Sequence, residues 1–479
     1  MNIIQFEKSI EDLRIADTKF MCLLNILNAI LSANGRAYFV GGCVRDLLLH
    51  KVPHDWDIVT NLKPNELITL FKGYNVDLVG KNFGVIVVDS FEIATFRKDV
   101  YSAEMFHRKG ADKIEFANTI EEDLSRRDLT INAIAIEYSG NPARPFERFI
   151  DPFNGVENLN KRIVSFVGDA NERIKEDPCR ILRACRFACL QDTAKAIDNK
   201  SLVAMYNNRR LFFLIAPERI RLEVMKAASQ FDNFDVFINY LTCIDILRYI
   251  FPLLAECKNI EGGQHHAEDV YDHCVLAARA VSKKYPLIRI AALLHDSAKP
   301  QVISKDEQGL IHFYGHEQVG SFLNRTFFHR LRFSKREVAY MCELIKKHMF
   351  YFEEITKDAT YRRFMSNMQI PVRDLLRLRI ADRRGNMAKN DRPTITFMFK
   401  KTLLRIRRIE REDKCLKLTD LVINGNDLIL MGYQPGPTFR LALEHCLAHV
   451  LEEPGRNNRE YLTNVVEEFM KQYNNLKGG

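Results

Sequence analysis

The feature that most constrains the fold is a glycine pair enclosed by two short apolar segments within residues 37–60. Residues 37–40, Ala-Tyr-Phe-Val, predict a short buried strand that runs into Gly41 and Gly42. Two glycines at the end of a strand allow the backbone to turn sharply and to approach a bulky ligand, commonly a phosphate. Residues 44–50 then predict one amphipathic helix.

Two acidic residues open the second apolar segment. Asp55 and Asp57 lead into Ile58 and Val59, and side chains at positions i and i+2 of a strand share one face. Two carboxylates held side by side repel each other unless a divalent cation lies between them. The pair is therefore suited to hold Mg²⁺ on a nucleoside triphosphate and to activate an attacking hydroxyl. Gly-Gly and Asp-x-Asp are each common in turns and surface loops, and only their combination at this spacing indicates such a site.

This combination resembles the signature Gly-Gly-x-Val-Arg-Asp followed by Asp-x-Asp of class II tRNA nucleotidyltransferases (CCA-adding enzymes) and bacterial poly(A) polymerases. The resemblance implies that Gly41, Gly42 and Arg45 contact the nucleotide, and that Asp55 and Asp57 are catalytic and hold Mg²⁺. It also implies an α+β fold, with a small mixed α/β head like that of DNA polymerase beta. An elongated all-α neck, a body with an HD domain and a tail would follow.

Composition is compatible with this expectation. The chain has 479 residues, which is enough for two to four domains. Of these residues, 47% are hydrophobic and 28% are charged, as in ordinary globular proteins. The net charge of +8 permits an RNA partner without requiring one. No apolar run approaches the ~20 residues of a membrane span, and the N-terminus has no signal-peptide pattern. Eleven scattered cysteines without a Cys-x-x-Cys pair favour a reduced cytoplasmic location and argue against a zinc ribbon.

A third acidic residue and a polar segment follow the signature. Residues 91–97 predict a further strand, and the alternation of side chains places Glu92 on one face of it. Glu92 is therefore the candidate for a third acid beside the Asp-x-Asp pair, although a solvent-facing glutamate on an edge strand would have the same pattern. Residues 98–118 are polar and charged and predict an irregular, mobile loop. Within it, His107-Arg-Lys-Gly departs from the usual family pattern, which leaves the switch from C to A addition open.

Residues 124–135, Leu-Ser-Arg-Arg-Asp-Leu-Thr-Ile-Asn-Ala-Ile-Ala, match the family's Arg-Arg-Asp-Phe-Thr-x-Asn-Ala motif with Leu129 in place of Phe. Guanidinium groups suit triphosphate oxygens, a carboxylate suits a ribose hydroxyl, and an amide suits either. On sequence alone, the same residues would usually form the exposed start of a helix. The nucleotide-binding candidates in this motif are Arg126, Arg127, Asp128 and Asn132.

Residues 176–180, Glu-Asp-Pro-Cys-Arg, predict the start of a helix on which Asp177 and Arg180 share a face. A carboxylate accepts from the exocyclic amine of cytosine or adenine, and a guanidinium donates to their ring acceptors, whereas uracil and guanine present a carbonyl instead. Such a pair selects C and A without a template; the simpler alternative is a salt bridge on a helix surface. The segment, continued by Arg183, also matches the family's nucleotide-selecting motif.

A second constellation of candidate ligands lies further along the chain. Residues 268–273 begin a helix that carries His273, and residues 291–296, Ala-Ala-Leu-Leu-His-Asp, end an apolar helix. With an aspartate downstream, they resemble an HD phosphohydrolase domain. The resemblance implies a divalent transition metal ion or Mg²⁺ at a site made of His273, His295, Asp296 and Asp382.

Two further histidines, His316 and His348, are candidates to extend this site to a second metal ion. A 2′,3′-cyclic phosphodiesterase or phosphatase acting on tRNA 3′ ends is the activity that the resemblance suggests. Such domains can also be purely structural, so hydrolysis stays an open expectation.

Residues 400–417 predict a basic helix with an apolar stripe, which is typical either of a solvated face or of a contact with an RNA backbone. The RNA-binding candidates are Lys400, Lys401, Arg405 and Arg408. Residues 421–428 and 432–437 resemble the family's tail module, so the resemblance covers nearly the whole chain. The predicted domains are a catalytic head at 1–150, a helical neck at 151–255, an HD domain at 256–390 and a tRNA-binding tail at 391–479.

The expected function is template-independent transfer of CMP, CMP and AMP from CTP and ATP to the 3′ end of tRNA, by a two-metal mechanism. The alternatives are a poly(A) polymerase, an A-adding or CC-adding specialist, and, from another class, an HD metallophosphohydrolase whose N-terminal half only binds RNA. Gly80-Lys-Asn-Phe-Gly-Val-Ile resembles the CCA-adding version of the family. We expect a cytoplasmic monomer or homodimer whose partners are tRNA, CTP and ATP, with no membrane contact.

Overall fold

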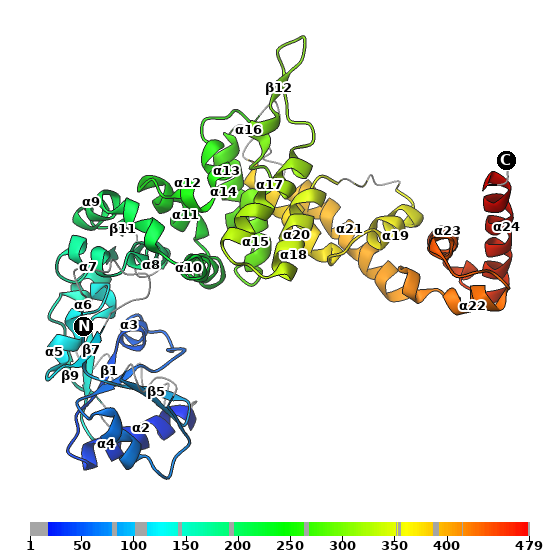
Figure 1. Cartoon of the computed structure of the whole chain (residues 1–479). Coiled ribbons are helices and arrows are strands. Elements are labelled where there is room, and N and C mark those ends of the chain that lie inside the picture. Colours follow the sequence, from blue (N-terminus) through cyan, green and yellow to red (C-terminus); the bar gives the residue numbers. More distant parts are fainter. Residues whose placement is uncertain are drawn as a thin grey trace. The chain divides into compact units, whose positions relative to one another are not determined.

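The structure is a computed structural model that describes residues 18–78, 84–100, 113–141, 146–190, 196–262, 268–350, 352, 356–386, 392–413 and 415–477. It divides into two compact units (Figure 1). The first unit comprises Met1–Ala255 with Phe327–Phe333, and the second comprises Glu256–Thr326 with Ser334–Gly479. The four domains predicted from the sequence remain a prediction.

The first unit is built on a mixed seven-stranded sheet with the order β3-β4-β5-β2-β1-β8-β9. Only the β2–β5 pair is parallel; the other pairs are antiparallel. Apolar residues at every position of the first strand fit its central place, since both of its faces are buried. The strands are β1 (Ala37–Val40), β2 (Ile58–Thr60), β3 (Val76–Asp77), β4 (Val85–Val88), β5 (Phe91–Thr95), β8 (Ala135–Tyr138) and β9 (Phe146–Ile150).

Helices α2 (Thr18–Ser32) and α4 (Pro64–Leu70) pack against the sheet and against each other (Figure 1). The predicted apolar face of the first helix is confirmed, because Leu23, Leu27 and Ile30 are fully buried. The predicted helix after the glycine pair also forms, as α3 (Gly42–Leu48), which begins at the second glycine.

The prediction of an irregular loop over residues 98–118 is wrong at its ends. Strands β6 (Arg97–Val100) and β7 (Lys113–Phe116) pair antiparallel, with Arg97 opposite Phe116. Backbone hydrogen bonds between the two strands outweigh their charged composition. Residues 101–112, including His107-Arg-Lys-Gly, lie outside the described residues.

The rest of the first unit is mainly helical, and α8 packs on α10 and α11. A two-stranded parallel pair, β10–β11, interrupts the predicted all-α neck. The elements are α5 (Ile120–Ser125), η2 (Thr130–Asn132), α6 (Gly155–Lys161), β10 (Ile163–Val164), α7 (Ala170–Glu176), α8 (Cys179–Phe187), β11 (Ala196–Ile197), α9 (Asn199–Asn207), η3 (Arg209–Leu214), α10 (Pro217–Gln230), α11 (Phe234–Cys243), α12 (Leu247–Ile250) and α13 (Pro252–Glu256).

The second unit is helical apart from one small antiparallel pair, β12–β13. No helix in the described part of the chain is long and apolar enough to cross a membrane. The elements are α14 (Val270–Ala280), α15 (Pro286–Leu294), α16 (Lys299–Val302), β12 (Ser304–Lys305), β13 (Ile311–His312), α17 (His316–Arg330), α18 (Lys335–Lys347), α19 (Asp358–Ser366), α20 (Val372–Gly385), α21 (Arg392–Glu412), η4 (Leu418–Asp420), α22 (Gly425–Leu430), α23 (Pro437–Glu452), η5 (Pro454–Arg456) and α24 (Arg459–Lys477).

Helices α14 and α20 approach each other closely at Gly385. A Cβ atom at this glycine would lie 2.7 Å from the backbone nitrogen of Ala277 and 3.0 Å from the carbonyl oxygen of His273. Only a residue without a side chain fits this contact. The same two helices carry His273 and Asp382, so their spacing sets the distance between two candidate ligands. The α+β fold class predicted from the sequence is confirmed.

Candidate functional site

Three acidic residues of the first unit gather at the start of the parallel strand pair. Ile58 of β2 lies opposite Ile93 of β5, so the preceding residues, Asp57 and Glu92, are neighbours across the two strands. Asp57 is still held in the sheet, because its carbonyl oxygen accepts from Val40 N at 3.0 Å. Its side chain is partly buried, whereas those of Asp55 and Glu92 are exposed. The predicted third acid thus comes next to the pair.

The electrostatics of this group suit a cation. Burial raises the pKa of Asp57, and the carboxylates of Glu92 and Asp55 raise it further, against the opposing effect of Arg127 and Arg45. Negative charges that raise the affinity of Asp57 for a proton equally favour a divalent ion bound to its oxygens. The three acids therefore fit Mg²⁺. Asp57, whose pKa is affected by both of the other acids and by both arginines, would be its central ligand.

The glycine pair lies directly against these acids. Gly41 adopts a φ of 70°, in the region that favours glycine. A Cβ atom on it would lie 2.8 Å from Arg127 Nη1 and 3.4 Å from Asp57 Oδ2. At Gly42 the corresponding distances are 3.7 Å to Arg45 Nη2 and 3.9 Å to Asp57 Oδ2. The turn therefore brings bare backbone next to both the acids and the arginines.

The arginines beside this turn are fixed by buried polar groups. Arg45 donates to Asn132 Oδ1 at 2.6 Å and to Asp46 Oδ1 at 2.8 Å. Asp123, whose side chain is fully buried, accepts from Arg126 at 2.9 Å and from Arg127 at 3.2 Å. The sequence analysis missed Asp123 of α5, although its spacing of three and four residues from the arginines that follow this helix was a usable signal.

Asp128 is paired with Arg183, a nucleotide-binding candidate from a different motif. Its Oδ2 accepts from Arg183 Nε at 2.5 Å and its Oδ1 from Leu129 N at 2.8 Å. Burial raises the pKa of Asp128, but the charge and hydrogen bond of Arg183 outweigh it and hold the pKa at about 2. Its predicted contact with a ribose hydroxyl stays a prediction.

This low pKa predicts a pH-dependent loss of stability. A carboxylate with a pKa of about 2 in the folded state and about 3.9 in the unfolded chain contributes about 2.5 kcal/mol above pH 4. The contribution is lost as the pH falls from about 4 to about 2. We therefore expect Asp128→Asn to lower the free energy of unfolding of the first unit at pH 7, with a smaller difference at pH 3, in urea titrations. A difference that stayed constant with pH would contradict this assignment, and the exposed Glu121→Gln is the matched control.

The predicted nucleotide-selecting pair is arranged differently from the expectation. Asp177 and Arg180 do not share a helical face, because α7 ends at Glu176 and Asp177 is extended, with a φ of −148°. Pro178 separates the two helices and N-caps α8. Proline favours extended backbone at the residue before it, so the predicted helix cannot start at Asp177.

Each member of the pair has its own ion-pair partner. Both carboxylate oxygens of Asp177 accept from Arg219 of α10, at 2.9 and 2.6 Å. Arg180, which is buried, donates to Glu176 at 2.6 Å and to the carbonyl oxygen of Arg126 at 3.0 Å. Arg219 was not identified from the sequence, because no local pattern links residues 42 positions apart.

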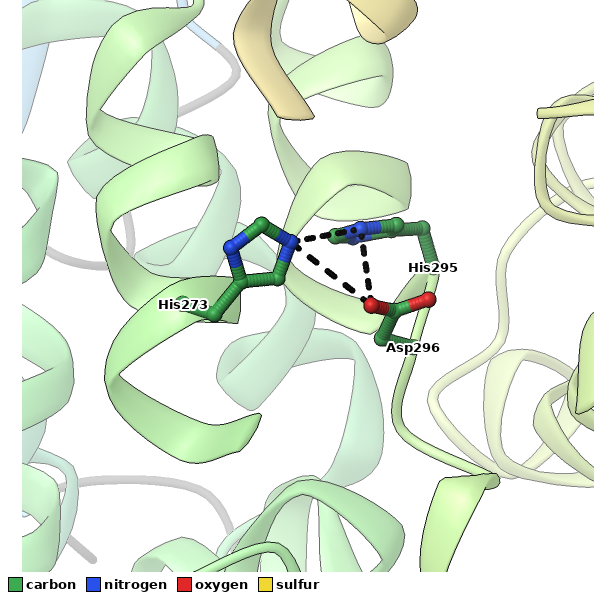
Figure 2. A group of neighbouring side chains, drawn as sticks. All are labelled: His273, His295 and Asp296. Carbon is green, nitrogen blue, oxygen red and sulfur yellow. Dashed lines mark hydrogen bonds and ion pairs between the residues drawn. The ribbon is translucent and has the colours of Figure 1, made fainter. Parts of the chain in front are cut away.

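The second unit brings together all four predicted HD ligands. The Nε2 atoms of His273 and His295 lie 3.2 Å apart, and Asp296 Oδ2 lies 3.6 and 3.4 Å from them (Figure 2). Asp382 Oδ1 lies 3.2 Å from His273 Nε2 and 3.7 Å from His295 Nε2. All four residues are buried. Ligands about 2.1 Å from an ion are about 3.4 Å apart in a tetrahedron, so these residues fit a metal ion.

The imidazole rings are oriented by a hydrogen bond at His295 and by an ion-pair contact at His273. His295 Nδ1 lies 2.7 Å from the carbonyl oxygen of Ala292, and His273 Nδ1 lies 3.2 Å from Glu268 Oε1. These contacts fix the rings with Nε2 toward the centre, as is usual around metal ligands. Lys299, which the sequence analysis also missed, lies one helical turn beyond Asp296, with Nζ 2.7 Å from Asp296 Oδ2.

The predicted RNA-binding residues all lie on α21, but the two arginines and the two lysines have different partners. Arg405 donates to Asp358 Oδ1 at 2.5 Å and lies over the ring of Tyr361, and Arg408 also pairs with Asp358. Lys400 is exposed, and Lys401 Nζ lies 4.7 Å from the centre of the Phe397 ring. The two arginines therefore join α21 to α19, and their role in RNA binding stays a prediction.

Comparison with protein families agrees with both sites. Residues 37–165 match the family described as the poly A polymerase head domain, and residues 264–424 match the HD domain. The first match contains the acids and the glycine pair, and the second contains the four HD ligands.

Curated relatives match 42–51% of the chain. The CCA-adding enzyme of Oceanobacillus iheyensis is 41% identical over 205 residues, 42% of this chain and 48% of that protein. The CCA-adding enzyme of Lactobacillus delbrueckii subsp. bulgaricus is 37% identical over 247 residues, 51% of this chain and 57% of that protein. The chain thus spans about half the length of the curated relatives that it matches.

Solved structures match nearly the whole chain at low identity. The structure of the Bacillus stearothermophilus CCA-adding enzyme in complex with CTP has a TM-score of 0.70 and 22% identity, over 96% of this chain and 100% of that one. The Thermotoga maritima CCA-adding enzyme complexed with tRNA has a TM-score of 0.56 and 20% identity, over 98% of both chains. The chain therefore contains a poly A polymerase head domain and an HD domain, and its fold is similar to that of CCA-adding enzymes of known structure.

Proposed function

We propose that the first unit transfers nucleotides to the 3′ end of tRNA without a template, adding C, C and A from CTP and ATP. The observation that carries the proposal is the packing of Asp57, between Glu92 and Asp55, against the backbone of the glycine pair and the side chains of Arg45 and Arg127. A triphosphate at the glycine turn would meet the arginines, and its α-phosphate would lie near the acids. CCA-adding enzymes that are 41% and 40% identical to this chain over 205 and 204 residues support the same proposal.

The acidic and the basic residues of this site would have different roles. Asp55, Asp57 and Glu92 would hold Mg²⁺, which supplies the positive charge that lowers the pKa of the attacking 3′-hydroxyl and offsets charge on the phosphates. Arg45 and Arg127 lie where they can bind the oxygens of the departing pyrophosphate. The buried Asp123 and Asn132 keep these guanidinium groups in place before the nucleotide arrives.

Asp177 and Arg180 retain capacity to bind a base. A carboxylate has about four acceptor positions, and the hydrogen bonds that Asp177 accepts from Cys179 N and Arg219 use three of them. Arg180 uses three of its five donors, on Arg173, Glu176 and Arg126. We propose that the remaining positions read the amine and the ring acceptors of cytosine and adenine, with Arg219 holding the Asp177 carboxylate at a fixed angle.

Gly41→Ala tests the glycine turn, because the turn has no room for a side chain at this position. The new methyl group would enter the space of Arg127 Nη1 and require an unfavourable backbone conformation, at a cost of about 1–3 kcal/mol. We expect kcat/KM for CTP to fall by at least ~10-fold. Gly73→Ala is the matched control, because a Cβ there meets nothing within 4 Å. Equal rates for both variants would argue against a role of the turn in binding the triphosphate.

The experiment that tests the proposal is incorporation of each labelled nucleotide, with Mg²⁺, into a tRNA transcript that ends at its discriminator base. Two C followed by one A, with no further extension, is the expected result. A long A ladder would indicate a poly(A) polymerase instead. One A added only to a CC-ended transcript would indicate an A-adding specialist, and incorporation that stops after two C would indicate a CC-adding one. No incorporation at any end would overturn the transferase proposal.

The second unit would hold a divalent metal ion at His273, His295, Asp296 and Asp382. The convergence of four buried donors supports this proposal. Mixed imidazole and carboxylate ligands favour a transition metal ion over Mg²⁺. We also propose a cytoplasmic location, for which the eleven free cysteines are the support, and a monomer or homodimer as the working state.

A further inference from the structure

Three guanidinium groups of the first unit converge on one aromatic ring. The centre of the Phe187 ring lies 4.3, 5.1 and 5.8 Å from the guanidinium carbon atoms of Arg186, Arg45 and Arg183. The face of an aromatic ring carries partial negative charge and attracts a cation that lies within about 6 Å of its centre. The Phe187 side chain is buried, so water screens this attraction only weakly. One ring therefore attracts three positive charges.

The three cations come from two separate helices. Phe187 is the last residue of α8, which also carries Arg183 and Arg186, whereas Arg45 lies on α3. Arg45 is one of the arginines beside the glycine turn, and its Nη2 atom would lie 3.7 Å from a Cβ atom at Gly42. The ring thus links α8 to the turn that would bind the triphosphate.

Three carboxylates balance the three cations. The distances from guanidinium nitrogen to carboxylate oxygen are 2.8 Å for Arg45 and Asp46, 2.5 Å for Arg183 and Asp128, and 2.6 Å for Arg186 and Glu223. Repulsion between the cations persists nevertheless. Burial lowers the pKa of Arg186, and the charge of Arg183 lowers it further, against the opposing effect of Glu223. The ring adds an attraction that the carboxylates alone do not supply.

Apolar packing alone does not explain an aromatic residue at this position. An aliphatic side chain such as leucine fills a comparable space, but it has no negatively charged face. Guanidinium groups placed against it would lose contact with water without an electrostatic gain. The cluster therefore requires an aromatic ring, and Arg45 is the member through which the ring can affect the triphosphate site.

We propose that Phe187 is a positioning residue for nucleotide transfer, whose ring anchors the Arg45 guanidinium to α8 and holds it at the triphosphate. The inference rests on the proposed function of the first unit. The hydrogen bonds of Arg45, two to Asp46 and one to Asn132, use three of the five N–H groups of arginine. Contact with the ring restrains the guanidinium without using an N–H group, so donors remain for the phosphate oxygens.

Binding of CTP to the full-length protein tests the role of the ring. Calorimetry with Mg²⁺ and without tRNA measures the Kd, and no nucleotide transfer is needed. We expect Phe187→Leu to raise the Kd about 10-fold, because a buried contact between a cation and a ring is worth about this factor. The KM for CTP should rise by a similar factor with kcat within about 2-fold, because Arg45 would bind the phosphates equally in the ground state and in the transition state.

Phe212→Leu is the matched control. Phe212 is a buried phenylalanine of η3 in the same unit, and its ring lies against those of Phe213 and Tyr249. This variant should keep the Kd within about 2-fold, and so should Phe187→Tyr, which retains the aromatic face. Equal increases in the leucine and tyrosine variants of Phe187 would assign the effect to shape and overturn the proposal. Thermal unfolding shows whether each variant is folded, and Phe187→Met replaces the leucine variant if that one is not.

A double-mutant cycle shows whether the ring acts through Arg45. Arg45→Gln alone should raise the Kd for CTP, and adding Phe187→Leu to it should change the Kd by less than about 2-fold. Additive increases would overturn the assignment, as would an unaltered Kd in folded Phe187→Leu. Either result beside normal incorporation of C, C and A by the unchanged protein would leave the proposed function intact. An unchanged protein that bound no CTP would overturn both.

Discussion

Replacing Asp57 by asparagine is expected to lower the rate of nucleotide incorporation by about 10³-fold or more. The change leaves the shape of the side chain but removes the charge at the centre of the acidic group. Charge stabilisation by a bound metal ion is worth several kcal/mol in the transition state, and each 1.4 kcal/mol corresponds to a factor of ten. The loss should appear in kcat measured with CTP and a tRNA transcript.

The Asp57→Asn variant should still fold, so its loss of activity can be distinguished from a loss of structure. Asp57 is partly exposed, and its carboxylate is repelled by Glu92 and Asp55. The unfolding midpoint of Asp57→Asn should therefore equal or exceed that of the unchanged protein. Glu121→Gln, an exposed acid-to-amide change in α5 of the same unit, should alter neither rate nor midpoint. A folded Asp57→Asn variant with an undiminished rate would rule out the acidic group as the catalytic centre.

The second large effect is expected on stability. Asp296→Ala should destabilise the second unit by about 3–5 kcal/mol in the presence of EDTA, because a buried charge pair loses one partner. Lys299 Nζ lies 2.7 Å from Asp296 Oδ2 and is buried, so the substitution leaves an ammonium group without its carboxylate. Urea titration followed by a probe in this unit measures the change.

Added metal should widen this difference. The unchanged protein gains stability from any ion that binds only the folded state, and the variant lacks the carboxylate that the candidate ligands surround. Glu307→Gln, exposed between β12 and β13, should behave as the unchanged protein with or without metal. Equal stability of Asp296→Ala and its parent would show that this carboxylate has no structural role.

The sequence was most informative where chemistry depends on short spacings. Asp55, Asp57 and the glycine pair lie within one strand–turn–helix segment, so their proximity follows from local geometry. Glu92 could also be predicted, because the alternation of side chains along a strand indicates on which face of the strand it lies. Its parallel pairing with β2 does not appear in the sequence. Family resemblance then placed the HD ligands, whose separations along the chain exceed any local pattern.

Contacts between distant elements were not predictable. The bidentate pair of Asp177 and Arg219 joins α10 to the segment between α7 and α8, and it decides how the carboxylate is aimed. The predicted common face failed because Pro178 breaks the helix at that position. The β6–β7 pair was missed because Arg97-Lys-Asp has no apolar alternation, although Lys113-Ile-Glu-Phe does alternate.

Gly385 has a consequence for how this family of sequences can vary. The residue supplies no ligand atom, yet a methyl group there would push α20 away from the backbone of α14 and carry Asp382 away from His273. A displacement of a few tenths of an ångström would spoil distances that metal coordination tolerates only narrowly. In relatives that need the metal ion, selection should therefore remove substitutions of this glycine as strictly as substitutions of the ligands themselves. In relatives whose site no longer functions, the position should vary.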